Sequence, residues 1–95
     1  MNTKALPVAK FRLGRIVPTP HALEVIPNED IVTGITRHQA GDWGELKAEE
    51  LIANDQPLVL GTRLRSAYRS TKGVKFWMIT EADRSVTRVI LPKDN

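Results

Sequence analysis

Apolar and polar residues alternate near the start of the chain, which is the pattern of a β-strand. Over residues 10–17, Phe11, Leu13 and Val17 fall on one face of such a strand and Ile16 falls on the other. A proline-rich stretch follows and ends the alternation. The spacing therefore predicts a first strand over residues 10–17, with apolar residues on both faces over part of its length.

The middle of the chain carries the spacing and the end signals of helices. Thr19 is a good N-cap residue and Pro20 suits the first helical position, so we expect a short helical turn there. Asn28 is expected to cap a second helix with one apolar stripe, and Gly41 suits the position just after its end. A third helix is predicted over residues 47–54.

Three further strands are predicted in the last third of the chain, over residues 63–70, 75–82 and 86–91. A hairpin loop at residues 71–73 would use Gly73 at positive φ. The order predicts an α+β fold: an N-terminal strand, two to three short helices and then a three-stranded antiparallel meander, forming one four-stranded sheet with the helices on one face. We expect residues 1–9 to be a flexible N-terminal tail and residues 10–95 to form this single domain.

The composition is that of a globular protein, with 41% hydrophobic and 26% charged residues in a chain of 95. Cysteine is absent, which excludes disulfides and cysteine-based metal sites. Residues 1–9 lack the apolar run of a signal peptide, and no stretch has the length of a membrane span. We therefore expect a cytoplasmic protein that makes no contact with a membrane.

Charge is segregated along the chain, although the net charge is only +3. Residues 1–17 carry +4, residues 18–61 carry −6 and residues 62–95 carry +5. One interpretation is a phosphate-binding basic face on one side of the molecule and an acidic face on the other. The other interpretation is that acidic helices lie near a basic sheet and largely neutralise it.

Basic residues of the last third concentrate on one face of the predicted sheet. In an extended strand, alternate positions share a face, and guanidinium groups aligned in this way can grip phosphates in bidentate geometry. A tryptophan on the neighbouring strand would add a surface on which a base can stack. The candidate nucleic-acid or phosphate site consists of Arg63, Arg65, Arg69, Lys75 and Trp77. Alternatively, the arginines keep an exposed face soluble and pair with Glu81.

A second candidate lies in the loop after the second predicted helix, where Asp42 and Trp43 precede a glycine. A tryptophan held in such a loop can anchor a partner protein. It can equally close the small hydrophobic core beneath the helices. Asp42 and Trp43 are therefore the candidate partner-binding residues.

The remaining titratable residues form no catalytic or metal-binding pattern. His21 and His38 lack a metal-ligand spacing, and a place at the end of a helix accounts for His38 through the helix dipole alone. Glu81 and Asp83 offer two carboxylates near a turn but belong to no calcium-loop pattern. We expect no catalytic residue, no metal and no cofactor.

Four short motifs carry a family resemblance: FRLGRIV at 11–17, RHQAGDWG at 37–44, SAYR at 66–69 and FWMITEADRS at 76–85. Together they resemble a family of short bacterial proteins, found on plasmids and other mobile elements, that has no established activity. Some members carry a label as a restriction-modification methylation subunit. This sequence has neither the glycine-rich cofactor loop nor the Asn-Pro-Pro-aromatic tetrapeptide that methylation requires.

The leading hypothesis is a non-catalytic accessory protein of a mobile element that contacts a protein or a nucleic acid. The alternative is a toxin, because the predicted order of elements is similar to the RelE/ParE fold, whose RNA-cleaving members use basic and aromatic residues on the sheet. In that case the residues of interest are Arg63, Arg65, Tyr68 and Arg69. A homodimer formed through a free sheet edge is a further expectation.

Overall fold

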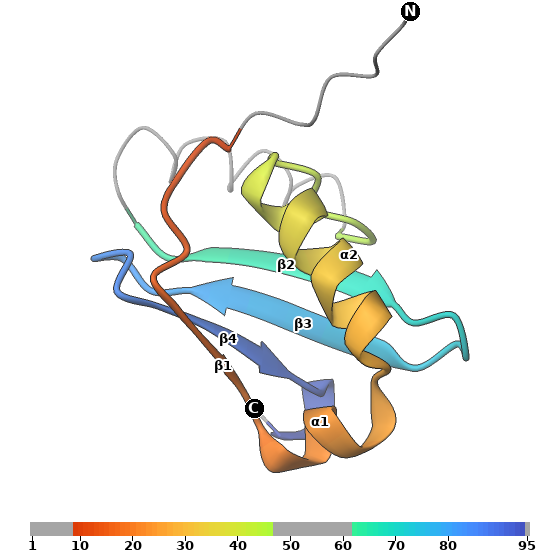
Figure 1. Ribbon diagram of the computed structural model, residues 1–95. Helices are drawn as coiled ribbons and strands as arrows, with labels where there is room; N and C mark the ends of the chain where they lie inside the picture. Colours follow the sequence, from red (N-terminus) through yellow and green to blue (C-terminus); the bar gives the residue numbers. More distant parts are fainter. Residues whose placement is uncertain (1–8, 47–61, 95) are drawn as a thin grey trace, which may run out of the picture.

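The computed structural model describes residues 9–46 and 62–94. Its strands form one mixed sheet in the order β1-β4-β3-β2 (Figure 1). Its elements, in chain order, are β1 (Arg15–Pro18), α1 (Pro20–Val25), α2 (Asn28–Gln39), β2 (Leu64–Arg69), β3 (Lys75–Thr80), β4 (Val86–Ile90) and the short 3-10 helix η1 (Pro92–Asp94). The strands β2, β3 and β4 form an antiparallel meander, and β1 pairs with β4 in parallel at the edge. This confirms the predicted α+β fold and adds that the sheet is mixed.

The first strand is shorter than its alternation predicts, which corrects the expectation of a strand over residues 10–17. Gly14 has a φ of 66°, and a Cβ at this position would lie 2.2 Å from the carbonyl oxygen of Ser85. The chain therefore bends next to β4 before it can pair, and pairing begins at Arg15. Within β1, Ile16 packs against the hydrophobic core, and the period-two rule places Val17 on the opposite face.

Helix α1 begins as the sequence predicts, because the Thr19 hydroxyl accepts a hydrogen bond from the amide of Ala22 at 3.1 Å and Pro20 follows it. Helix α2 begins differently. Pro27, with φ −57° and ψ 143°, is the N-cap and makes no side-chain cap bond, so Asn28 is the first helical residue and not the cap. The fixed φ of proline already supplies the extended entry that a capping residue needs.

The end of α2 and the β2–β3 hairpin follow the predicted turn chemistry. Gly41 and Gly73 both have positive φ, at 82° and 83°, as expected for a helix end and a hairpin loop. Asp30, in the first turn of α2, accepts hydrogen bonds from the amide and the hydroxyl of Thr71, at 3.0 and 2.9 Å. These bonds tie the helix to the hairpin.

The hydrophobic core lies between α2 and one face of the sheet, across which α2 runs obliquely (Figure 1). Its buried members come from both helices, from the three strands of the meander and from the segment just after β4: Ala22, Ile26, Ile31, Tyr68, Phe76, Met78, Val89 and Leu91. Burial alternates along β2, with Leu64, Ser66 and Tyr68 facing this core. The opposite face of the sheet is covered by neither α1 nor α2.

The predicted third helix, at residues 47–54, lies outside the described residues. Within residues 9–46 and 62–94, no helix has both the length and the apolar character needed to cross a membrane.

Candidate functional site

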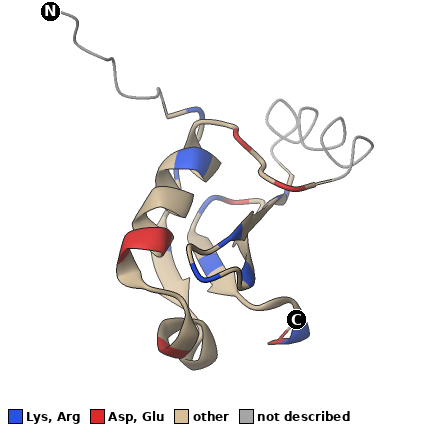
Figure 2. Cartoon of the chain, turned by 90° about the vertical axis from the view of Figure 1, so that its right-hand side faces the viewer, with Lys and Arg blue, Asp and Glu red and all other residues tan. Residues whose placement is uncertain are grey.

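The face of the sheet opposite α2 carries most of the basic residues of the strands. Viewed from the side, α2 stands to one side of the sheet and blue Lys and Arg segments follow the strands (Figure 2). Register and alternation place six cations on this face: Arg15, Arg63, Arg65, Arg69, Lys75 and Arg88. We call these residues together with Trp77 the basic face.

The cations come together because the strands bring them into register. Ile79 of β3 lies between Arg65 of β2 and Arg88 of β4, and it is only 3% exposed. Lys75 is the direct partner of Arg69. The long side chains therefore cover apolar atoms of the sheet with their stems while their charged ends reach solvent.

Two glutamates interrupt the positive charge without cancelling it. Glu81 lies between two arginines, with its oxygens 4.0 Å from Arg63 Nε and 3.5 Å from Arg88 Nε. Glu45 accepts two hydrogen bonds from Arg69, at 3.2 and 3.3 Å. The side chains of Arg63 and Arg88 remain 58% and 55% exposed, so water screens these pairs and both cations stay accessible to a ligand.

Trp77 lies near the centre of the basic face, between Ala67 of β2 and Ile90 of β4. The guanidinium carbon of Arg65 lies over its ring, 4.4 Å from the ring centroid, which is a cation–π contact. The hollow beside this pair has a volume of about 250 Å³ and is lined by Glu45, Leu46, Arg65, Ala67, Tyr68, Lys75 and Trp77. A second hollow, of about 300 Å³, is lined by Thr19, Arg63, Ile79, Glu81, Arg88, Ile90 and Asp94.

The structure brings the five predicted site residues of the basic face together. Arg88 and Arg15 were missed by the sequence argument. The signal for Arg88 was present, because the same alternation applied to β4 places it with Val86 and Ile90 on this face. Tyr68, which belongs to the toxin hypothesis, lies on the opposite face, where it is 2% exposed and its hydroxyl donates to the Asp42 carbonyl at 2.5 Å.

The other predicted site is divided between the interior and the surface. Trp43 is 4% exposed, and its ring packs against Phe11 and His38, with centroids 6.1 and 5.6 Å away. Asp42 is exposed and forms a bidentate pair with Arg37, at 2.7 and 3.1 Å. The hydrogen bond from Arg37 lowers the pKa of the Asp42 carboxyl. In this arrangement Trp43 closes the end of the core, and Asp42 faces solvent.

A buried chain of hydrogen bonds, centred on His38, crosses the covered face. His38 is 0% exposed; its Nδ1 is bonded to the Ser66 hydroxyl, and its Nε2 lies 2.8 Å from the Thr80 hydroxyl. Thr80 in turn lies 2.7 Å from the Thr87 hydroxyl, which donates to the Leu13 carbonyl at 2.7 Å. The chain joins α2, each strand of the meander and the segment before β1.

The direction of this chain follows from its end. Because the Thr87 hydroxyl donates its proton to the Leu13 carbonyl, the Thr80 hydroxyl must donate to Thr87. Thr80 then accepts from Nε2–H of His38, and Nδ1 accepts from Ser66. His38 is therefore the neutral Nε2–H tautomer. The hydrogen-bond chain, and not the helix dipole, accounts for a histidine at this position.

Burial also keeps His38 neutral. Desolvation, and to a smaller extent the positive charge of Arg84, lower the pKa of His38 from 6.5 to about 4. Burial likewise raises the pKa of the Tyr68 hydroxyl. This network was not predicted from the sequence, where its signal is the polar residues Ser66, Thr80 and Thr87 at inward-facing strand positions.

No group of three or more His, Cys, Asp or Glu side chains able to hold a metal ion occurs within the described part of the chain. Comparisons with models of protein families, with curated proteins and with solved structures found no match.

Proposed function

We propose that this chain is a non-catalytic binding module that contacts nucleic acid through the basic face. The observation that carries the proposal is the grouping of six cations around one tryptophan on the sheet face that α1 and α2 leave uncovered. Cations of this density favour a polyanion, and the aromatic ring offers a stacking surface to an unpaired base.

The accessibility of the arginines supports this proposal. Arg63, Arg69 and Arg88 make ion pairs, yet their side chains remain 58%, 48% and 55% exposed. Exposed pairs of this kind contribute little to stability, so a phosphate can replace a carboxylate at little cost. A guanidinium also binds phosphate in the same bidentate geometry that Arg69 uses with Glu45.

The buried network argues against a catalytic role for its members. The imidazole of His38 is hydrogen-bonded to the hydroxyls of Ser66 and Thr80, and each of these residues is 0% exposed. Their donors and acceptors are used up in the chain that ends at Leu13. These groups stabilise the fold, and a substrate cannot reach them without unfolding it.

The resemblance to short proteins of plasmids and other mobile elements supports an accessory role on such an element. The RNA-cleaving alternative needs Arg63, Arg65, Tyr68 and Arg69 to act on one substrate. Tyr68 faces the core, on the side of the sheet opposite the arginines. This placement favours binding over cleavage.

Fluorescence anisotropy of labelled single-stranded RNA and duplex DNA, at low and moderate salt, tests the proposal. The test variant is the triple Arg63, Arg65, Arg69→Ala. The control variant is the triple Lys10, Arg12, Lys72→Ala, which removes three exposed cations that lie outside the strands. Circular dichroism confirms that both variants are folded.

We expect wild-type binding to weaken with salt, the face variant to bind about tenfold or more weakly, and the control variant to stay close to the wild type. Absence of binding at low salt would contradict a nucleic-acid partner. A protein partner of the same face would then be sought by pull-down with the same three proteins. Cleavage of the labelled RNA by the wild type would instead favour the toxin alternative.

A further inference from the structure

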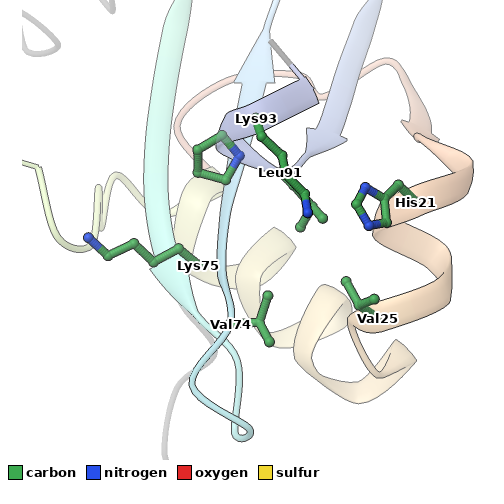
Figure 3. A pocket seen from close by; sticks show the side chains of 7 residues that line it. His21, Val25, Val74, Lys75, Leu91 and Lys93 are labelled. Atoms are coloured by element: carbon green, nitrogen blue, oxygen red, sulfur yellow. The ribbon is translucent and has the colours of Figure 1, made fainter.

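A third hollow lies between α1, the start of β3 and the segment after β4 (Figure 3), and shares only Lys75 with the basic face. Its volume is about 320 Å³. The side chains that line it come from three separate parts of the chain: His21, Val25, Val74, Lys75, Leu91, Pro92 and Lys93. Leu91 belongs to the core, and Val25 and Val74 pack against it, so the core connects the three segments that form the hollow.

The lining is mainly apolar. Leu91 is a buried member of the core, and Val25 and Val74 are partly buried against it. Pro92 adds a rigid apolar ring at the start of η1. A small hollow of this kind, apolar with few polar groups, suits the apolar body of a small ligand.

The polar groups at the rim are mainly cationic. In Figure 3 the Lys93 side chain extends toward His21, whereas the Lys75 side chain extends away from the other lining residues. Within residues 9–46 and 62–94, no carboxylate lies within ion-pair distance of Lys93. Among the residues that the structure describes, Lys93 is therefore a cation without an ion-pair partner, beside an apolar surface.

The neighbouring acid is already engaged. Asp94 Oδ1 lies 3.3 Å from His21 Nδ1, and its other oxygen accepts from the Thr19 hydroxyl and the Leu91 amide, at 3.5 and 3.4 Å. In these contacts His21 Nδ1–H donates to the Asp94 carboxylate, so Lys93 is the group at the rim that can pair with an anion. The charge pattern of the rim therefore favours one anionic group close to Lys93.

We propose that this hollow binds small apolar monocarboxylates. The carboxylate pairs with the Lys93 ammonium, and the apolar body lies on Val25, Val74 and Leu91. A ligand with about ten non-hydrogen atoms in a hollow of this size has a dissociation constant on the order of 1 mM. The site shares only Lys75 with the basic face, and the Lys75 side chain extends away from the other lining residues, so this proposal and the nucleic-acid proposal can fail separately.

Titration with octanoate, followed by amide chemical shifts in ¹H–¹⁵N NMR spectra, tests the site. Octan-1-ol, which has the same chain without the charge, is the comparison ligand. Lys93→Gln removes the rim charge and keeps part of the aliphatic stem, and Lys72→Gln makes the same change at an exposed lysine of the hairpin that does not line the hollow. Val74→Phe fills the hollow, and its melting temperature shows whether the fold is kept.

We expect octanoate to give saturable shifts at residues 21–25, 74, 91 and 93, and to bind more tightly than octanol. Lys93→Gln should weaken octanoate binding about tenfold without changing octanol binding, as expected for loss of a charge-assisted hydrogen bond. Lys72→Gln should stay within about twofold of the wild type, and a folded Val74→Phe should bind neither ligand. Shifts that do not saturate, that map to Arg63, Arg65 and Arg88 of the basic face, or that are equal for octanoate, octanol and Lys93→Gln would overturn the proposal.

Discussion

The two faces of the sheet differ more than the alternation of apolar and polar residues suggests. Phe76 and Trp77 are neighbours on β3 and point to opposite faces. Phe76 is 1% exposed within the core under α2. Trp77 is only partly buried and shares its ring face with the guanidinium of Arg65. Phe76 therefore contributes to the hydrophobic core, whereas Trp77 contributes to the basic face on the other side of the same strand.

Polar groups show the same difference. On the covered face, hydroxyls and an imidazole form a closed chain in which every proton has an acceptor. On the basic face, carboxylates and guanidiniums form exposed pairs with more cations than anions. The covered face therefore specifies the fold, and the basic face is left available for a partner.

The largest expected effect is the difference in free energy of unfolding between the Phe76→Ala and Trp77→Ala variants. Phe76→Ala should lower the free energy of unfolding by about 3–5 kcal/mol, because it leaves a cavity in the only core found within the described residues. Trp77→Ala should cost clearly less, since its ring is partly exposed and one of its faces contacts the guanidinium of Arg65. Urea denaturation of both variants measures the difference, and equal losses would show that the two faces are equally important for stability.

The next effect is the dependence of stability on pH. Since His38 has a pKa of about 4 when folded and about 6.5 when unfolded, the unfolded chain takes up a proton first as the pH falls. The stability contributed by neutral His38 is complete above pH 6.5 and is lost as the pH falls towards 4, by about 3 kcal/mol in all. Urea denaturation between pH 4 and 7 checks this.

The two histidines provide the control for that experiment. His38→Gln should remove this part of the pH dependence, whereas His21→Gln, at a partly exposed position outside the core, should retain it. If His38→Gln has the same pH dependence as the wild type, the buried network does not hold a neutral imidazole.

A smaller effect is expected from cutting the buried chain in its middle. Thr80→Val keeps the shape of the side chain but leaves His38 Nε2–H and the Thr87 hydroxyl without their common partner. The free energy of unfolding should fall by about 1–3 kcal/mol, the cost of leaving buried polar groups unpaired. Thr80→Ser retains the hydroxyl and should cost less. A Thr80→Val protein as stable as the wild type would show that these hydrogen bonds add nothing to stability.

The smallest effect on stability is expected from a change on the basic face that should also make RNA binding tighter. Glu81→Gln removes the negative charge between Arg63 and Arg88, both about half exposed, and should change the free energy of unfolding by less than about 1 kcal/mol. Binding of single-stranded RNA should become about threefold tighter at low salt, from the Coulomb energy of one charge several ångströms from a phosphate. Glu24→Gln, on α1, is the matched control, and equal gains for both variants would show that only net charge matters.

The architecture was largely predictable from sequence because its signals are local. Alternation placed Arg63, Arg65 and Arg69 on one face, and Thr19 with Pro20 marked the start of α1. Such signals depend on a few consecutive residues and on rules of backbone geometry. The error at β1 was also local in origin, since alternation over residues 10–17 gives no sign that Gly14 bends against Ser85.

The site could be predicted only in part, because its remaining features are long-range. His38 meets Ser66 and Thr80 across 28 and 42 positions of sequence, so nothing beside it in the chain indicates its partners. The parallel pairing of β1 with β4, which adds Arg15 to the basic face, depends on the order of strands in the sheet. Strand order is set by packing over the whole sheet and leaves no mark on a single segment.

The central claim is that binding belongs to the basic face and not to the net charge of the chain. The most direct test is the slope of log K against log salt concentration for single-stranded RNA, measured for the wild type and the two triple variants defined above. We predict that Arg63, Arg65, Arg69→Ala reduces the slope by about 0.7 for each lost phosphate contact, or about 2 in total, while Lys10, Arg12, Lys72→Ala leaves it nearly unchanged. Equal slopes for the two folded variants would contradict the claim, because binding would then follow total charge and not position on the sheet.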